Sequence, residues 1–150
     1  MEHIAIMRKS WGLLGKILTG KKKIESRWYK NKCRPWDKIK KGDTIYFKDS
    51  GEPASLKAKV EKIFQFENLT PEKVKNILNK YAKDDGIEKE RIPEFFRRFE
   101  NKKYCLLIFL KNPQKIRPFE INKTGFGTMS AWLIVENINQ VLKKNENILK

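Results

Sequence analysis

Strand-like segments make up most of this chain, and the helical segments between them do not alternate with the strands regularly. Period-two alternation, with β-branched and aromatic residues, predicts strands over residues 3–7, 24–29, 44–48, 56–64, 103–110, 115–121 and 131–135. Helical spacing of apolar residues predicts helices over residues 11–19, 71–81, 93–99 and 136–148. This order predicts an α+β domain around a small, mostly antiparallel β-barrel with inserted and flanking helices.

Particular residues define two of these predicted elements more closely. Leu56, Ala58, Val60 and Phe64 supply the apolar positions of one long strand. Asn112 and Pro113 predict a turn between two separate strands. The 150 residues fit one domain (1–150), and 39% hydrophobic content is enough to bury a core.

Positive charge is concentrated in the first part of the chain. The 34 Lys and Arg residues against 18 Asp and Glu give a formal net charge of +16. Residues 1–41 hold 13 of these cations and three carboxylates, and therefore carry +10. A Lys-rich composition can serve solubility alone, but an uneven distribution creates a local field that attracts polyanions. The sequence therefore favours a phosphate-bearing partner.

Several protein classes fit the sequence poorly. Cys33, Cys105 and the single His3 do not have the paired spacing of a structural metal site, so we expect no metal and no cofactor. A disulfide between the two cysteines stays open. We see no secretory leader and no membrane-length apolar run, which predicts a soluble, cytoplasmic protein with no membrane partner.

Charged residues meet at the end of the first predicted helix. Gly20 is suited to end that helix, which places Lys22 at a tight corner before the next strand. Glu25 and Arg27 are two residues apart and share one face of that strand. If the face is solvated, water satisfies these charges and no partner or ligand is needed. If it is interior, each charge needs a partner, either within the cluster or on an anionic or polar ligand.

This cluster resembles the signature of the ASCH family within the PUA-like superfamily. The pattern is Gly20-x-Lys22-x-x-Glu25-x-Arg27, and it follows a helix with Trp, Leu and Ile at helical spacing. The turn and strand at residues 41–47 are similar to a second landmark of the family, and residues 118–127 are similar to archaeal-type single-domain members. The resemblance implies a PUA-like barrel, a cleft between barrel and helices, and an RNA-related role.

Some members similar to this chain are amidohydrolases that act on a modified nucleoside such as acetylated cytidine, with a lysine, a threonine and a glutamate. The resemblance assigns the lysine to Lys22, but Glu25 stands where those enzymes have threonine. The nearest match to their glutamate is Asp85, beside Gly86. A carboxylate can act as general base for water while Lys22 stabilises an oxyanion, so Lys22, Glu25 and Asp85 are the catalytic candidates if the protein is an enzyme.

Aromatic residues lie among the cations of this region, as in proteins that stack bases and bind phosphates. Trp11 is expected in the core, whereas Trp36, which follows Pro35 in a loop, is the best candidate for an exposed stacking residue. Lys123 and Thr124 lie in a Gly-containing loop that can approach a phosphate. The candidate nucleic-acid-binding residues are Arg8, Lys9, Lys22, Arg27, Trp28, Trp36, Lys123 and Thr124.

The cations from Lys57 onward are interspersed with Glu and Asp and predict solvated faces. Binding of RNA or a nucleotide is the function that the sequence favours. The alternatives are the small amidohydrolase, a nuclease without a metal cluster, and a protein-interaction adaptor whose partner the sequence does not indicate.

Overall fold

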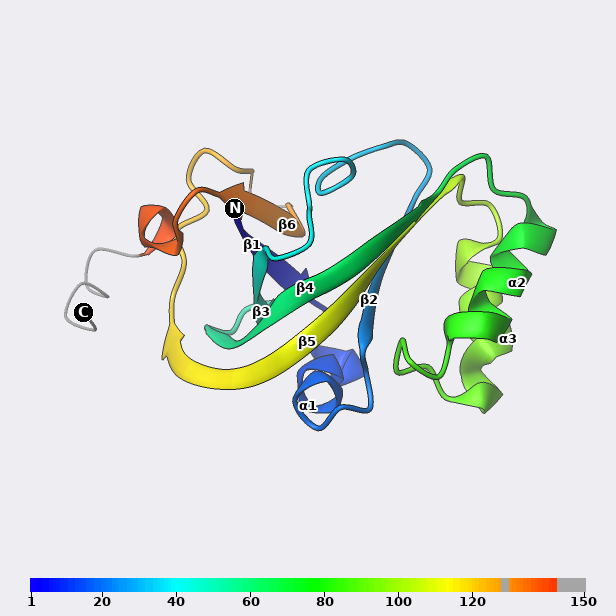
Figure 1. The fold of residues 1–150 in the computed structure, drawn as a ribbon, viewed down its shortest axis with the longest axis horizontal. Helices are drawn as coiled ribbons and strands as arrows, with labels where there is room; N and C mark the ends of the chain where they lie inside the picture. Colours follow the sequence, from blue (N-terminus) through cyan, green and yellow to red (C-terminus); the bar gives the residue numbers. More distant parts are fainter. Residues whose placement is uncertain (128–129, 143–150) are drawn as a thin grey trace.

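A computed structural model of the chain describes residues 1–127 and 130–142, which contain one six-stranded sheet and three α-helices (Figure 1). The strands are β1 (Glu2–Met7), β2 (Ile24–Tyr29), β3 (Thr44–Asp49), β4 (Ala54–Phe66), β5 (Tyr104–Phe119) and β6 (Trp132–Val135). Their order is β2-β5-β4-β3-β1-β6, with β1 and β3 parallel and every other neighbouring pair antiparallel. The sheet curls into a half-barrel, which confirms the predicted α+β class.

The helices lie at the two sides of β2. α2 (Pro71–Tyr81) and α3 (Ile92–Phe99) lie side by side at one end of the sheet, and α1 (Leu13–Leu18) lies near the middle of β5 (Figure 1). Thr70 caps α2 as expected, since its side chain accepts a hydrogen bond from the Lys73 amide. The first helix is shorter than predicted. A 3₁₀ turn (Lys9–Trp11) precedes it, and left-handed Gly12 (φ 60°) separates the two.

Apolar side chains form separate clusters on the two faces of the sheet. One cluster fills the barrel and includes Phe47, Val60 and Ile108. Another joins β2 and β5 to α2 and α3 and includes Ile24 and Leu107. The second cluster fixes α3 over the outer face of β2, where the candidate site lies.

β5 is one continuous strand, so the predicted turn at Asn112 and Pro113 is wrong. Lys57 pairs with Gln114 and Lys59 with Lys111, which leaves one extra residue on β5. Asn112 adopts a positive φ of 51° there. Both Asn with positive φ and Pro are tolerated in a β-bulge, because the bulge needs no ladder hydrogen bond from the extra residue.

A second bulge changes which face β4 presents. Val60 pairs with Leu110 and Lys62 with Phe109, so β4 has one extra residue between them. Before the bulge Leu56, Ala58 and Val60 face the barrel; after it Ile63 faces the barrel. The prediction that Phe64 continues the apolar face of Leu56 is therefore wrong, because the extra residue reverses the alternation.

The end of the chain also differs from expectation. Residues 138–141 form a 3₁₀ turn, and Leu142 bridges to Ile121, so the described part of the predicted 136–148 helix is not α-helical. The rest of that prediction, residues 143–148, lies outside the described residues. Cys33 and Cys105 are both free thiols. Over residues 1–127 and 130–142, no helix has the length and apolarity to span a bilayer.

Candidate functional site

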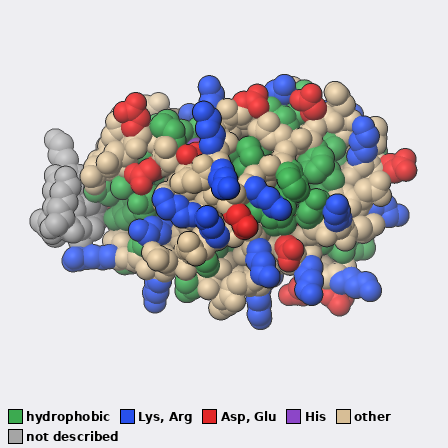
Figure 2. All heavy atoms as spheres, viewed as in Figure 1, with side chains coloured by type: hydrophobic (Ala, Val, Ile, Leu, Met, Phe, Trp, Pro, Cys, Tyr) green, Lys and Arg blue, Asp and Glu red, His purple; other side chains and the backbone are tan. Residues whose placement is uncertain are grey.

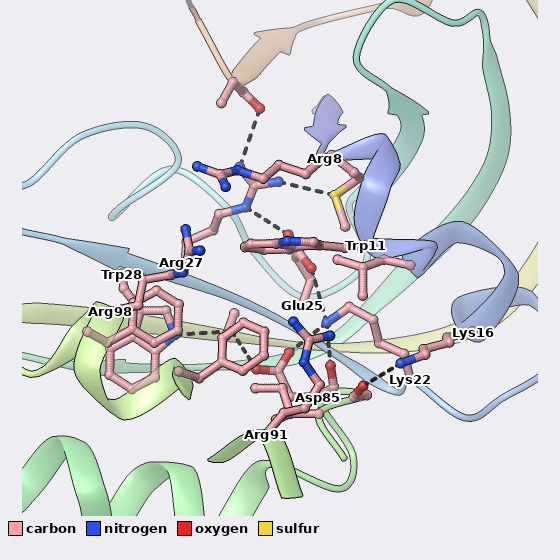
Figure 3. Close-up of a pocket in the computed structure, with 18 of the residues that line it drawn as sticks. Arg8, Trp11, Lys16, Lys22, Glu25, Arg27, Trp28, Asp85, Arg91 and Arg98 are labelled. Carbon is pink, nitrogen blue, oxygen red and sulfur yellow. Dashed lines mark hydrogen bonds and ion pairs between the residues drawn. The ribbon is translucent and has the colours of Figure 1, made fainter. Parts of the chain in front are cut away.

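A pocket of about 420 Å³ opens between β2, the first helical segment, the loop after α2, and α3 (Figure 3). Its floor network, as we call it, consists of polar side chains that contact one another: Lys22, Glu25, Ser26, Arg27 and Asp85. Its rim consists of cations that are more exposed: Arg8, Lys16, Arg91, Arg98 and Lys102.

Lys22 lies at the centre of the floor. Gly20, with φ 82°, ends the first helical segment, and the Lys22 amide then donates to the carbonyl of Lys16. The Lys22 side chain is only 3% exposed. Its Nζ lies 2.6 Å from Asp85 Oδ1, 2.7 Å from the Asp85 carbonyl and 3.3 Å from Glu25 Oε1. An ammonium has three N–H donors, so these acceptors saturate it.

The loop after α2 brings Asp85 to Lys22. The amides of Lys23 and Ile24 both donate to the Asp84 carbonyl, which fastens the loop to the start of β2. Gly86 follows in a left-handed conformation (φ 78°), and a Cβ atom there would lie 3.1 Å from Lys22 Cβ. Only glycine allows this turn and this close approach without strain.

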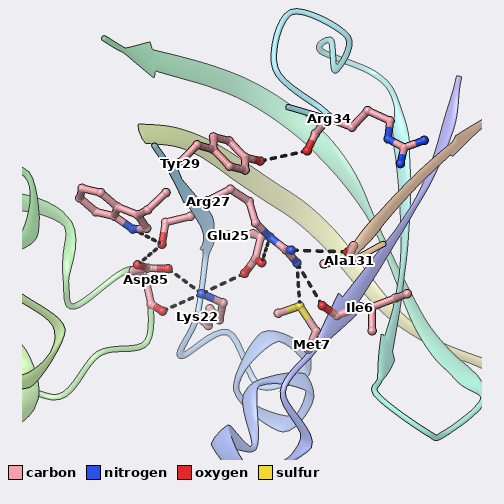
Figure 4. A network of polar contacts seen from close by, with 11 residues as sticks. Ile6, Met7, Lys22, Glu25, Arg27, Tyr29, Arg34, Asp85 and Ala131 are labelled. Carbon is pink, nitrogen blue, oxygen red and sulfur yellow. Dashed lines mark hydrogen bonds and ion pairs between the residues drawn. The ribbon is translucent and has the colours of Figure 1, made fainter. Parts of the chain in front are cut away.

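Glu25 and Arg27 extend the network across β2 (Figure 4). Arg27 Nε donates to Glu25 Oε2 at 2.8 Å. The Arg27 guanidinium then reaches Met7 Sδ at 3.4 Å, the Ile6 carbonyl at 3.5 Å, and the ring of Trp132, whose centroid is 4.9 Å away. Glu25 is buried, so the solvated strand face is the wrong alternative. The charges are interior and paired with one another.

Electrostatics keep Lys22 charged. Burial disfavours its ammonium, but the nearby carboxylates of Asp85 and Glu25 outweigh burial and raise the pKa of Lys22 above its ordinary value. The positive charge is therefore a fixed part of the floor.

Polar contacts continue from Asp85 to the aromatic wall. The Ser26 hydroxyl donates to Asp85 Oδ2 at 2.6 Å, and Trp28 Nε1 donates to Ser26 Oγ at 3.2 Å. The Trp28 ring stacks on Phe99, with centroids 4.7 Å apart and planes 6° apart. Trp28 thus lines the pocket, but one of its faces is already covered.

Trp11 forms the opposite aromatic wall and is more accessible than Trp28. The guanidinium carbons of Arg8 and Arg98 lie 5.0 Å and 5.2 Å from its ring centroid. Phe95 meets it edge to face at 5.6 Å. The rim cations are therefore interleaved with aromatic rings, which is the combination that holds bases and phosphates together.

Solved structures with a similar fold include ASCH proteins. The crystal structure of ASCH from Zymomonas mobilis superposes with a TM-score of 0.63 at 16% identity, over 98% of this chain and 91% of that chain. The chain has an ASCH-like fold. A serine-to-alanine variant of the Zymomonas mobilis protein matches with a TM-score of 0.61 at 18% identity, over 99% of this chain and 92% of that chain.

A hypothetical protein, PH0355, matches with a TM-score of 0.51 at 23% identity, over 77% of this chain and 100% of that chain. No protein-family model matches the sequence, and a search of curated proteins finds no match. At these identities the likeness establishes the ASCH-like fold alone.

The ASCH-like fold brings together six of the residues singled out from sequence. Within one pocket lie Arg8, Lys22, Glu25, Arg27, Trp28 and, from the loop after α2, Asp85. Lys9 lies outside it and forms an exposed ion pair with Glu52. Lys123, whose Nζ donates to the Ser130 carbonyl, and Thr124 also lie outside the pocket lining.

The expected exposure of Trp36 is wrong. Trp36 is 6% exposed and packs edge to face on Tyr104 at 5.4 Å, within the barrel cluster. The amides of Lys38 and Ile39 donate to the Pro35 carbonyl, and this turn directs the indole inward. Trp36, which follows Pro35, is therefore a core residue and not a stacking surface.

Several residues of the pocket were not predicted from the sequence. Trp11 was expected only to pack in the core, and Arg91 and Arg98 were expected on solvated faces. Both arginines line the pocket with Phe95 and Lys102. Residues 91, 95, 98 and 102 recur at helical spacing, so they share one face. That one-sided run of cations around an aromatic residue was the signal available in the sequence.

Proposed function

We propose that this protein binds RNA by taking one unstacked nucleotide into the pocket, with the base inside and the phosphate at the rim. The observation that carries the proposal is that one cavity combines an aromatic wall with cations at its opening. Trp11 offers an aromatic wall, and Arg8 and Arg98 lie over that wall at the opening. The pocket's volume, about 420 Å³, falls in the range of small-ligand sites.

Net charge supports an anionic ligand. Seven Lys or Arg side chains line the pocket against two carboxylates, Glu25 and Asp85. Both carboxylates already pair with Lys22 or Arg27. Among the ion pairs of residues 1–127 and 130–142, none involves Arg8, Arg98 or Lys102. These rim cations are therefore suited to phosphate oxygens.

The test compares two neighbouring arginines of α3. Arg98 lines the pocket, whereas Arg97 is exposed on the same helix and does not line it. We expect Arg98→Ala to weaken binding of single-stranded RNA and to lower the salt slope by about 0.7, the value for one phosphate contact on a single strand. Arg97→Ala is the matched control and should change both quantities less.

Fluorescence anisotropy over a salt series measures both quantities. Equal effects of Arg98→Ala and Arg97→Ala would place the binding elsewhere. RNA binding that is undetectable at low salt would overturn the proposal.

Hydrolysis of a modified nucleoside is the second candidate, and it has one specific observation in its favour. Lys22, Glu25 and Asp85, the three catalytic candidates, meet on the pocket floor. Their pairing nevertheless favours binding over catalysis. The Lys22 ammonium has all three donors occupied, and both oxygens of Glu25 contact cations, so neither group is free to contact a reacting substrate.

Incubation with acetylated cytidine separates the two functions. A hydrolase releases acetate and loses that activity in Glu25→Gln and Asp85→Asn. A binding protein leaves the nucleoside unchanged but still binds RNA in the anisotropy experiment.

A further inference from the structure

A second aromatic surface lies on the outer face of the sheet, apart from the pocket. Four aromatic side chains of β4, β5 and α2 contact one another, and we call them the aromatic platform: Phe64, Phe66, Tyr81 and Phe109. Phe64 is at its centre, with ring centroids 5.0 Å from Phe109 and 6.4 Å from both Phe66 and Tyr81.

The platform is open to solvent. Phe64 is 37% exposed, and in the described part of the chain only two other large hydrophobic residues, Met1 and Leu18, are as exposed or more. Figure 2 shows hydrophobic side chains gathered on this face between β4/β5 and α2, with Lys and Arg side chains beside them. The bulge in β4 is the cause, because it turns Phe64 away from the barrel.

Lysine side chains lie on the platform itself. Lys62 Nζ is 4.5 Å from the ring centroid of Phe109 and 5.2 Å from that of Phe64. Lys80 Nζ is 5.4 Å from the centroid of Tyr81. Cations held on aromatic rings in this way add positive charge to the platform.

The surrounding surface is also positive. Exposed Lys23 lies beside β5, since its carbonyl accepts from the Leu110 amide, and exposed Lys111 follows Phe109 on the same strand. The carboxylates nearest along the chain are Glu61, Glu67 and Asp84, and Glu67 pairs with Lys32. Four lysines against three carboxylates, one of them already paired, favour an anionic partner over an apolar protein surface.

The platform lies close to the pocket in the sheet. Ser26 of the floor network pairs with Leu107, and Leu107 pairs with Phe64. Three neighbouring strands thus connect pocket and platform, a separation of two strand spacings or about 10 Å. Leu107 is buried between them in the cluster that includes α2, so a strand that joins the two sites must run over the surface of the protein.

We propose that the aromatic platform is a second nucleotide site, where a base of the same RNA strand stacks on Phe64 while Lys62 and Lys80 hold the adjoining phosphates. This inference rests on the proposed function, because the pocket supplies the first contact. Stacking on an aromatic side chain tolerates any base, so the platform adds affinity and strand length rather than sequence preference.

The experiment compares a ligand that fills one site with a ligand that spans two. Uridine monophosphate tests the pocket alone, and an oligouridine of about nine nucleotides, within the range that single-strand-binding domains cover, tests both. We expect Phe64→Ala to leave the affinity for the monophosphate unchanged and to lower the affinity for the oligomer about 5-fold or more, as for one lost stacked base. Phe64→Tyr keeps a ring and should retain the affinity.

Lysine variants supply a matched pair. Lys62→Ala should weaken oligomer binding and lower its salt slope, whereas Lys75→Ala, an exposed lysine of α2, should change neither as much. Thermal unfolding of each variant confirms that the fold is retained.

The outcomes separate the two proposals. If wild-type protein binds neither ligand, the proposed function fails. If it binds both but Phe64→Ala leaves oligomer affinity unchanged, the platform is not an RNA site, as expected of a protein contact. Equal losses for monophosphate and oligomer would show an indirect effect on the pocket and would also overturn the inference.

Discussion

The floor and the rim of the pocket both contain Lys and Arg side chains, but these cations have different partners in the two places. On the floor, Lys22 and Arg27 are matched by Glu25 and Asp85, and the three residues Lys22, Glu25 and Asp85 are almost fully buried. On the rim, Arg8 and Arg98 lie over an aromatic ring rather than a carboxylate.

The difference indicates a division of roles. Buried charges that satisfy one another define a single arrangement of the surrounding chain, and removing one partner is costly. Cations on aromatic rings at the surface are held weakly and can turn to a ligand. We therefore expect floor substitutions to reduce stability and rim substitutions to reduce binding.

The largest expected effect comes from breaking the floor. Lys22→Met removes the cation that Asp85 and Glu25 share, which leaves buried Asp85 without its cation and Glu25 paired with Arg27 alone. We expect a loss of about 3–5 kcal/mol in the free energy of unfolding, measured by urea denaturation. Lys9→Met, which removes an exposed pair with Glu52, is the control and should leave the stability nearly unchanged.

A double variant tests whether the loss comes from uncompensated charge. Lys22→Met combined with Asp85→Leu removes both partners of the shortest ion pair on the pocket floor. Its loss in the free energy of unfolding should be smaller than the sum of the losses of the two single variants, because the double variant leaves neither an unpaired lysine nor an unpaired aspartate at this position. Additive losses would mean that packing, rather than charge pairing, stabilises the floor.

A smaller effect is expected where the loop after α2 contacts Lys22. Gly86 and Gly51 have similar positive φ angles, 78° and 82°, but only a Cβ at Gly86 would meet another atom within 4 Å. Both Gly→Ala variants should lose about 1–2 kcal/mol from backbone strain. Gly86→Ala should lose more and should also weaken RNA binding, because its Cβ displaces Lys22. Equal losses would show that the close contact relaxes freely.

Much of the fold and the centre of the site were predictable because their causes are local. The spacing of Lys22, Glu25 and Arg27 placed three charges at one corner, and the structure pairs them there. Thr70 and Pro71 fixed the start of α2 for the same reason. Asp85 was found only through a family resemblance, since it lies 63 residues from its partner Lys22.

The rest depended on long-range packing. The extra residue in β4 turns Phe64 outward, and alternation alone does not reveal a bulge. Trp36 is buried because Tyr104, distant in sequence, offers it a surface in the barrel. Arg98 belongs to the site because α3 packs over β2, a contact made by apolar residues and not by the arginine itself.

The floor network continues beyond the pocket through a chain of contacts from Arg27 to His3. Trp132, whose ring lies below Arg27, donates from Nε1 to His3 Nδ1 at 3.0 Å. The hydrogen of the His3 ring is therefore on Nε2, which donates to Asp43 Oδ2 at 2.8 Å. Burial lowers the pKa of His3 below its ordinary value, although Asp43 opposes this shift.

The smallest expected effect is a pH dependence from this histidine. Below about pH 6.5 the unfolded chain binds a proton at His3 that the folded protein does not, so the stability that is present above this pH falls as pH decreases toward the lowered pKa of the folded state. One group contributes at most about 1.4 kcal/mol per pH unit. His3→Gln keeps an acceptor and a donor but does not titrate, so urea denaturation at about pH 7.5 and about pH 5.5 should show a steeper loss for the wild type. Equal slopes would mean that His3 has the same pKa in the folded and the unfolded chain, so that the bond from Trp132 does not favour its neutral form.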